Sequence, residues 1–175
     1  MEESLLEQAK KIKLLLLDVD GVLTDGRIIY DSRGQDMKFF DVHDGLGVYL
    51  LNKAGIKTML ITAKSSRAIR PRARDMGVEA VFENVSVKSS VLGKILKKYK
   101  LNLEEICFVG DDLVDLCLMK KVGFPIAVFN AAGEIKQVAS YITLKPGGRG
   151  AVREVAELIL KAQGKWGGLL GSYDL

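Results

Sequence analysis

The sequence predicts an α/β fold in which a parallel sheet carries helices on both faces. Short apolar runs alternate with segments of helical periodicity along the whole chain, and no repeat or low-complexity segment interrupts them. The runs at 14–17 and 106–110 are almost wholly apolar, which is typical of strands buried on both faces. Three runs end in polar residues, and parallel strands bring their carboxyl ends to one edge of a sheet, where ligands bind. The 175 residues fit a single domain without a linker.

The strands of the sheet are expected where short apolar runs lie between turn residues. An amphipathic helix is predicted at 3–11, and strands and helices then alternate. The predicted strands lie at 13–18, 56–62, 78–82, 106–110, 125–129 and 141–144.

The expected helices follow from apolar residues at helical spacing and from the glycines that end them. Gly55 ends one helix and Gly77 ends the next. Pro71 lies inside the second of these, which predicts a kink or a late helix start. The helices that follow the first are predicted at 44–54, 65–77, 88–99, from the end of the acidic segment 111–115 to about 122, at 132–139 and at 150–162.

Residues 27–41 predict a β-hairpin inserted between the first strand and the next helix. Two apolar segments flank a turn at 32–35. Apolar residues occur on both faces of the hairpin, and a small surface hairpin cannot bury both by itself. We therefore expect the hairpin to project from the domain and to pack against another subunit.

Residues 164–175 are too rich in glycine for a helix or a strand and predict a flexible tail. The apolar residues of this tail either pack on a neighbouring subunit or are disordered, and the pattern favours neither.

The composition predicts a globular cytoplasmic protein. Hydrophobic residues make up 48% of the chain and charged residues 27%, and the net charge is +4. The basic residues are spread along the chain without a stripe, so we expect no nucleic-acid partner. No apolar run reaches membrane-spanning length and no signal core is present, so we expect no membrane partner. The two cysteines lack metal spacing and cannot form a disulfide framework.

Two acids follow the first buried strand, and a third acid follows the fourth strand. Asp18 and Asp20 stand two residues apart before Gly21, which allows a tight turn, and Asp111 follows the strand at 106–110. Carboxylates at the mouth of buried strands require a cation, a shared proton or both. A set of ligands made only of oxygen atoms suits Mg²⁺. Zinc is not expected, because the chain has one histidine and no pair of cysteines at metal-binding spacing.

A phosphate group needs positive charge and hydrogen-bond donors beside such a metal. The hydroxyl of Thr62 and the ammonium group of Lys88 can supply them. One carboxylate can then attack phosphorus to give an aspartyl-phosphate, while a second protonates the leaving oxygen and later deprotonates water. The residues are therefore consistent with phosphoryl transfer, which requires mostly positioning and charge compensation.

Four segments in this order resemble the motifs of haloacid dehalogenase (HAD) superfamily phosphatases. The segments are Asp18-Val-Asp20-Gly-Val-Leu-Thr24, Thr62, Lys88 and Gly110-Asp111-Asp112-Leu-Val-Asp115. The resemblance implies a Rossmann-like fold and an aspartyl-phosphate mechanism. For the last two acids of the fourth segment, Asp112 and Asp115, it implies a supporting or structural role.

The same resemblance implies roles for individual residues. Asp18 is the expected nucleophile and a Mg²⁺ ligand. Asp20 is the expected general acid/base and gives its backbone carbonyl to the metal. Thr62 and Lys88 are expected to hold the phosphoryl group, and Asp111 is expected to complete the metal site.

Further segments resemble the family of phosphatases that act on 3-deoxy-D-manno-octulosonate 8-phosphate (KDO 8-phosphate). These are the hairpin, the loop from residue 41 to 47 and the glycine-rich loop from 147 to 154, so the likeness spans nearly the whole chain. Members of that family lack a cap domain and form tetramers in which hairpins and a neighbour's tail close the site. The resemblance implies a Mg²⁺-dependent homotetramer that hydrolyses a small phosphorylated sugar acid in lipopolysaccharide precursor synthesis. The intervals between the motifs are too short to contain a cap.

The resemblance also implies a set of substrate contacts. The expected substrate-binding residues are Asp20, Asp41, Val42, His43, Asp44, Gly45, Lys64, Arg72 and Lys88. For His43, a structural hydrogen bond is an equally weighted alternative. The family's usual Thr-Gly-Arg is Thr62-Ala63-Lys64 here, which keeps the charge but loses the bidentate fork.

Two alternative functions remain open at this point. One is a phosphatase for a related nine-carbon ketodeoxy acid, although an acid is expected at position 64 in those enzymes. The other is a non-catalytic assembly module of the same fold.

Overall fold

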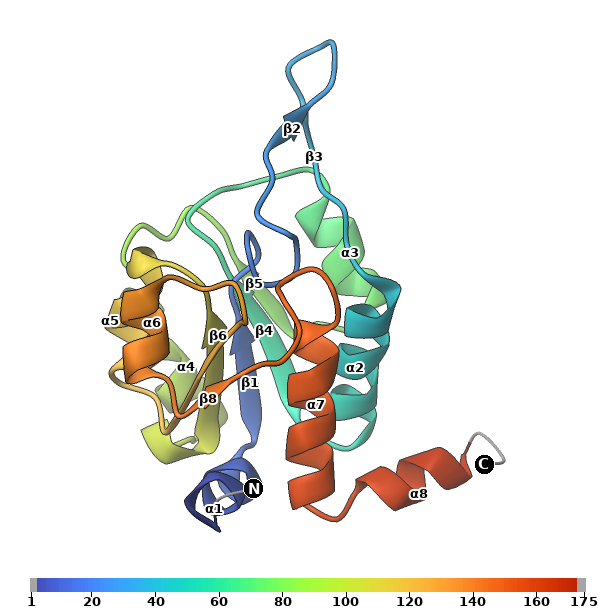
Figure 1. Ribbon diagram of the computed structural model, residues 1–175, viewed down its shortest axis with the longest axis vertical. Helices are drawn as coiled ribbons and strands as arrows, with labels where there is room; N and C mark the ends of the chain where they lie inside the picture. Colours follow the sequence, from blue (N-terminus) through green and yellow to red (C-terminus); the bar gives the residue numbers. More distant parts are fainter. Residues whose placement is uncertain (1–2, 173–175) are drawn as a thin grey trace.

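The computed structural model describes residues 3–172, and it confirms the predicted α/β fold with a parallel sheet (Figure 1). Six strands form one sheet in the order β5-β4-β1-β6-β7-β8, and every neighbouring pair is parallel. All four leucines of the central strand β1 are fully buried, as expected for a strand covered on both faces. The strands are β1 (Leu14–Leu17), β4 (Lys57–Ile61), β5 (Ala80–Phe82), β6 (Ile106–Gly110), β7 (Phe124–Ala127) and β8 (Tyr141–Ile142).

Helices cover both faces of the sheet (Figure 1). The chain runs from β1 to β4 and β5 in one direction and from β5 to β6, β7 and β8 in the other. Right-handed crossovers therefore place the two sets of connecting helices on opposite faces. One face carries α2 (Val42–Lys53), α3 (Ile69–Asp75) and α7 (Ala151–Ala162), the other carries α4 (Leu92–Tyr99), α5 (Leu116–Met119) and α6 (Gly133–Val138), and α1 (Glu3–Lys11) packs against α7.

Two helices on the α7 face begin at other residues than predicted. Helix α2 begins two residues early, because the side chain of Asp41 accepts the backbone N–H of His43 and caps the helix. Helix α3 begins late, at Ile69. This start places Pro71 in the first turn, where a backbone N–H has no intrahelical partner.

Two helices on the other face begin as 3₁₀ turns: η1 (Lys88–Val91) precedes α4, and η3 (Leu113–Asp115) precedes α5. The side chain of Asp112 accepts the backbone N–H of Leu113 at the start of η3. These turns direct the side chains of Lys88 and Asp115 toward each other below the carboxyl edge of the sheet.

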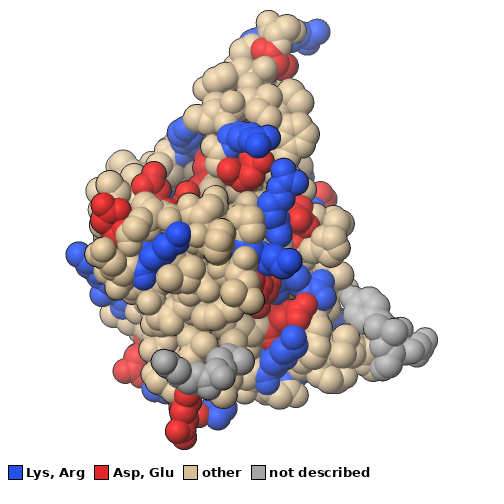
Figure 2. Space-filling view, viewed as in Figure 1, with Lys and Arg blue, Asp and Glu red and all other residues tan. Residues whose placement is uncertain are grey.

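The predicted hairpin projects beyond the carboxyl edge of the sheet (Figure 1). Strands β2 (Ile29–Tyr30) and β3 (Asp36–Met37) pair antiparallel, and Asp31 accepts the backbone N–H groups of Arg33 and Gln35 across the turn. In Figure 2 the hairpin rises above the body as a mostly uncharged surface. Its exposed apolar side chains are Ile28, Tyr30, Met37 and Phe39.

The expectation that residues 164–175 form neither helix nor strand is wrong for 166–171, which form helix α8 (Trp166–Gly171). The ring of Trp166 lies 5.5 Å from the guanidinium of Arg153 and 5.2 Å from the ammonium of Lys161. Leu169 is buried against the core. A glycine costs a helix only about 1 kcal/mol relative to alanine, and the burial of Leu169 together with the packing of the half-buried Trp166 stabilises α8 against this cost.

Helix α8 lies at the end of the sheet opposite the hairpin (Figure 1). The ammonium group of Lys165 donates to the carbonyl of Ala54, at 3.1 Å, and so ties the start of α8 to the end of α2. Residues 173–175 of the predicted tail lie outside the described residues. Within residues 3–172, no helix has both the length and the apolar character needed to cross a bilayer.

We expect Gly147→Ala to destabilise the protein by about 1–3 kcal/mol, as overpacking of a tight site does. A Cβ at this position would lie 1.7 Å from the carbonyl oxygen of Gly21, in the turn that follows β1. Urea unfolding measures the change. Gly93→Ala is the matched control, because its Cβ meets no atom within 4 Å in α4. It should stabilise the helix by about 0.5–1 kcal/mol, and equal stabilities of the two variants would contradict this packing.

Candidate active site

The polar residues that end β1, β4 and β6 line one small cavity at the carboxyl edge of the sheet. The cavity measures about 280 Å³. The parallel register of β1 with β4 and β6 brings the ends of these strands together. The residues that line the cavity are Asp18, Asp20, Gly26, Thr62, Ala63, Lys64, Lys88, Asp111, Asp112 and Val114. The structure thus brings together every residue that the sequence assigned to catalysis, phosphate binding or metal binding.

Lys88 is fully buried between two carboxylates. Its ammonium group lies 2.7 Å from Asp18 Oδ1 and 2.6 Å from Asp115 Oδ1. Asp18 Oδ1 also accepts the backbone N–H of Val19, at 2.7 Å. Buried charges are tolerated only when they are paired in this way. Since both of its partners within residues 3–172 bind Oδ1, Asp18 Oδ2 remains available for a ligand.

Asp115 is a central residue that sequence reasoning left to a supporting or structural role. Its side chain is fully buried, binds Lys88 and accepts the backbone N–H of Asp111 at 2.9 Å. Gly110 permits this approach, because a Cβ there would lie 2.6 Å from Asp115 Oδ2. A sequence signal for an inward role of Asp115 was available. Asp112 and Asp115 are three residues apart, the spacing of a capping box, and they form such a box around η3.

Two acidic residues of the cavity, Asp18 and Asp111, have raised pKa values. Burial raises the pKa of Asp18 to about 6; the charge of Asp115 adds to this shift and Lys88 opposes it. Burial raises the pKa of Asp111 to about 8, and the charges of Asp18 and Asp115 contribute further. Burial alone would lower the pKa of Lys88, but its two ion pairs raise it overall. The cavity therefore holds more negative charge than Lys88 can neutralise.

The donor set fits Mg²⁺. Carboxylate oxygens of Asp18, Asp111 and Asp115 lie within 4.8 Å of one another. The oxygens of Asp115 are already engaged, which leaves Asp18 and Asp111 as ligands for an ion that uses one or two carboxylates, waters and a phosphate. Gly21, at φ +92°, lets the backbone pass Asp111, because a Cβ there would lie 1.9 Å from Asp111 Oδ2. The carboxylate of Asp20 lies outside this group, and a role for its backbone carbonyl stays a prediction.

We expect Mg²⁺ to bind more tightly as the pH rises from 6 to 8, because Asp18 and Asp111 must lose protons of pKa about 6 and about 8 to bind it. Both values exceed the ordinary 3.8 of an aspartate. The metal-free protein therefore loses stability as the pH rises from about 3.8 up to these two values, and Mg²⁺ restores it. The increase in Tm on Mg²⁺ addition, followed across this pH range, measures the effect.

Asp111→Asn is the control for this linkage. It should reduce Mg²⁺ stabilisation and remove most of its pH dependence above pH 6, because only the proton of Asp18 then remains to be released. Equal stabilisation of the unmodified protein at both ends of the range would contradict the linkage.

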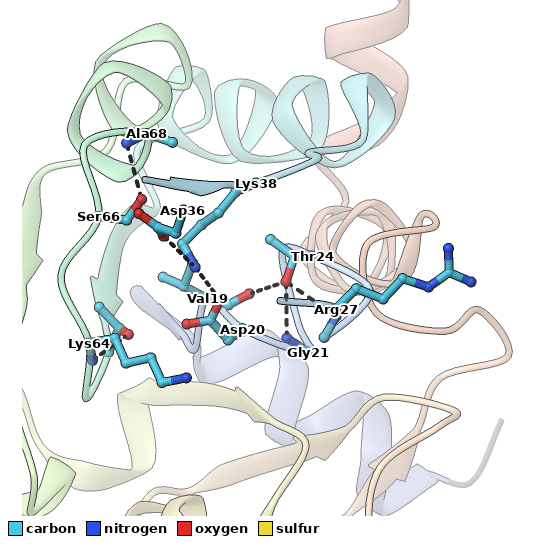
Figure 3. A network of polar contacts seen from close by, with 12 residues as sticks. Val19, Asp20, Gly21, Thr24, Arg27, Asp36, Lys38, Lys64, Ser66 and Ala68 are labelled. Atoms are coloured by element: carbon cyan, nitrogen blue, oxygen red, sulfur yellow. Dashed lines mark hydrogen bonds and ion pairs between the residues drawn. The ribbon is translucent and has the colours of Figure 1, made fainter. Parts of the chain in front are cut away.

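Asp20 lies at the rim of the cavity and contacts the hairpin (Figure 3). Its carboxylate forms an ion pair with Lys38, which directly follows β3. The hydroxyl of Thr24 accepts the backbone N–H groups of Gly21 and Gly26 and so shapes the turn that carries Asp20. Sequence reasoning missed Lys38, and the available signal was a single cation between two apolar residues of the hairpin.

A second cavity, of about 840 Å³, lies between the hairpin and the segment that follows β4. It shares Asp20, Ala63 and Lys64 with the small cavity, so the two cavities adjoin. The backbone N–H of Lys64 donates to the hydroxyl of Thr62, at 3.1 Å, and its side chain points toward Asp20 in Figure 3. The cationic side chains of the larger cavity are Lys38, Lys64, Arg67 and Arg70.

The predicted substrate loop at 41–45 and Arg72 line neither of these cavities. The guanidinium of Arg72 donates to the carbonyl of Asp41, at 2.8 Å, and rests against Gly45, whose Cβ would lie 2.1 Å from it. Residues 41–43 instead line a cavity of about 520 Å³ on the opposite face of the hairpin. Contact of these residues with a substrate stays a prediction.

Two side chains of this loop are engaged in contacts within the fold. Asp44 is buried and accepts the backbone N–H groups of Gly150 and Arg153, at 3.3 and 2.8 Å, at the start of α7. His43 is exposed, and its Nδ1 lies 3.0 Å from Asp41 Oδ1.

Known proteins resemble this chain over most of its length. The haloacid dehalogenase-like hydrolase family matches residues 76–154. The 3-deoxy-D-manno-octulosonate 8-phosphate phosphatase KdsC of Escherichia coli K12 is 39% identical over 158 residues, which cover 90% of this chain and 84% of that protein. KdsC of Yersinia pestis is 36% identical over 97% of this chain and 90% of its own length.

Solved structures agree with these relatives. The Moraxella catarrhalis KDO 8-phosphate phosphatase, in complex with magnesium ion, phosphate ion and KDO, matches with a TM-score of 0.96 and 40% identity over 99% of both chains. The cobalt-bound Haemophilus influenzae enzyme matches with a TM-score of 0.86 and 35% identity over 90% of this chain and 92% of that one.

These similarities in sequence and fold agree with the function that the geometry of the small cavity indicates. Asp18, Thr62, Lys88 and Asp111 occur together in an α/β fold that matches these enzymes, and the acidic group fits the predicted Mg²⁺. The chain therefore belongs to the KDO 8-phosphate phosphatase family of haloacid dehalogenase-like hydrolases and is a phosphatase with Mg²⁺ as its cofactor.

Proposed function

We propose that this protein hydrolyses KDO 8-phosphate to KDO and phosphate in lipopolysaccharide precursor synthesis. The observation that carries the proposal is that two cavities adjoin. The small one holds the acidic and phosphate-binding residues, and the larger one, lined by cations, has room for a sugar acid. They meet at Asp20 and Lys64.

In the proposed first step, Asp18 attacks phosphorus and forms an aspartyl-phosphate. The N–H of Val19 and the ammonium of Lys88 fix the orientation of the Asp18 carboxylate for this attack. As the bond from phosphorus to the sugar oxygen breaks, Asp20 gives its proton to that oxygen. A bound Mg²⁺ supplies positive charge that offsets repulsion between the carboxylates and the phosphate.

In the proposed second step, Asp20 accepts a proton from a water molecule that attacks phosphorus. The bond between phosphorus and Asp18 breaks, and phosphate leaves. Lys88 and the hydroxyl of Thr62 lie where they can hold the phosphoryl oxygens through both steps.

The sugar-acid carboxylate is proposed to bind in the larger cavity. Arg67 donates to Gln35 of the hairpin at 3.2 Å, and Arg70 pairs with Glu83 at 2.7 Å, so both guanidinium groups are oriented by neighbours. Lys64 stands at the junction of the cavities and supports an eight-carbon acid over the nine-carbon alternative.

A phosphate-release panel with Mg²⁺ tests the substrate. We expect turnover of KDO 8-phosphate to exceed that of a nine-carbon ketodeoxy acid 9-phosphate and that of a neutral sugar phosphate. Preference for the nine-carbon acid would support the alternative substrate. No release from any sugar-acid phosphate would overturn the proposed substrate class.

We further propose that the protein is a cytoplasmic homotetramer in which a neighbouring chain completes the site. The exposed apolar side chains of the hairpin support this, as does the absence of residues 41–45 and Arg72 from the lining of the two active-site cavities in their own chain. Sedimentation of the active protein tests it, and a fully active monomer would contradict it.

A further inference from the structure

Lys38 is a shielded cation on an otherwise exposed hairpin. Its side chain is 9% exposed, whereas its neighbours Met37 and Phe39 are 45% and 61% exposed as residues. Side chains alternate between the two faces of an extended strand. The alternation here turns two apolar side chains outward and directs the lysine toward the sheet edge (Figure 3).

The target of this lysine is the carboxylate of Asp20. The ammonium group of Lys38 binds Asp20 Oδ1 and lies 3.5 Å from Asp36 Oδ2, so Asp36 helps to orient it. Within residues 3–172, the Asp20 carboxylate accepts no other hydrogen bond. The second oxygen of Asp20 is therefore left to face a ligand.

A carboxylate at the rim of a cavity needs such a partner to keep one orientation. The turn of Thr24 fixes the backbone near Asp20, but the Asp20 side chain is 28% exposed and free to rotate without a contact of its own. Proton transfer requires the donor oxygen within hydrogen-bond reach of the leaving oxygen.

We propose that Lys38 is a positioning residue through which the hairpin aligns Asp20 for proton transfer to the leaving sugar oxygen. This inference rests on the proposed acid/base role of Asp20. As the bond from phosphorus to oxygen breaks, the proton of Asp20 moves to the leaving oxygen. The carboxylate that results already faces the ammonium group of Lys38, which stabilises the negative charge as it forms.

Two other roles of Lys38 would give different kinetics. A residue that only anchors the hairpin would lower activity on all substrates alike. A residue that only binds the sugar acid would raise KM for KDO 8-phosphate and leave simple phosphate esters unaffected, because they carry no sugar.

The experiment measures kcat/KM of Lys38→Met on p-nitrophenyl, phenyl and benzyl phosphate. The leaving oxygen becomes more basic in this order, so its departure depends increasingly on protonation. For such esters kcat/KM reports only steps up to departure of the leaving group. We expect a loss of roughly 10–100-fold on benzyl phosphate, a part of the usual contribution of general acid catalysis. We expect a change of less than about 3-fold on p-nitrophenyl phosphate, whose leaving group departs without a proton.

Three further variants make the test specific. Arg33→Met removes a cation from the exposed tip of the same hairpin and should leave the series unchanged. Lys38→Arg keeps the charge and should restore part of the benzyl phosphate activity. Lys38→Met added to Asp20→Asn should cost nothing further, because a residue that acts through Asp20 has no effect once the acid is gone.

The outcomes separate this inference from the proposed function. Equal losses across the series, or a further loss in the Asp20→Asn background, would overturn the positioning role while leaving Asp20 as the acid. An Asp20→Asn protein with full activity on benzyl and sugar phosphates would overturn the proposed role of Asp20, and the inference with it.

Discussion

Asp18→Asn will lower phosphate release by at least roughly 10⁴-fold, a loss typical of removing a catalytic nucleophile. An amide oxygen carries no charge and is a poor nucleophile, and it is also a weaker ligand for a hard cation. The fold should remain intact, because the amide has the shape of the carboxylate and can still accept the N–H of Val19. A neutral amide also avoids the free-energy cost of burying a charge. That cost is what raises the pKa of Asp18 to about 6.

A phosphate-release assay with Mg²⁺, accompanied by urea unfolding, measures both effects. Asp75→Asn is the matched control, since it removes a carboxylate at the end of α3, outside both cavities, and should leave turnover unchanged. Turnover of Asp18→Asn above one hundredth of the unmodified rate would argue against Asp18 as the nucleophile.

Lys88→Met will lower the free energy of unfolding by about 3–5 kcal/mol, as expected when one partner of a buried ion pair is removed. Lys88 bridges Asp18 and Asp115, and all three side chains are buried. Methionine fills a similar volume but leaves two carboxylates facing each other without a cation. Urea unfolding in the presence of EDTA measures this change without compensation by Mg²⁺.

Two comparison variants separate charge from packing. Lys161→Met removes an exposed ion pair with Glu157 and should change stability by less than about 1 kcal/mol. Adding Asp115→Asn to Lys88→Met removes one of the stranded charges and should recover part of the loss. A Lys88→Met protein as stable as the Lys161→Met variant would show that this buried cluster does not depend on its cation.

Most of the small cavity could be predicted from local sequence patterns. Asp18, Thr62 and Asp111 each follow an apolar run that forms a buried strand, and Lys88 begins a helical segment. The parallel sheet then brings these ends together, because right-handed crossovers leave few alternative topologies. Their convergence required no knowledge of side-chain contacts.

The central role of Asp115 depended on a backbone detail that hydrophobic periodicity does not encode. The helix was predicted to follow the acidic segment 111–115, but a 3₁₀ turn capped by Asp112 forms within that segment, at Leu113–Asp115. That turn directs Asp115 inward to Lys88 rather than outward to solvent. Similarly, α8 forms despite its glycines, because its position beside α7 buries Leu169 and brings the ring of Trp166 against Arg153.

By itself, the sequence determined the α/β class, the ligand edge of the sheet and the acids that stand there, because burial and strand periodicity are local properties of the chain. Only the tertiary structure decided which partners hold those acids. Lys88 pairs with Asp18 and is itself held by Asp115, and Lys38 pairs with Asp20. These contacts join residues far apart in the chain, and their geometry depends on where each turn begins and on which face of a strand a side chain lies.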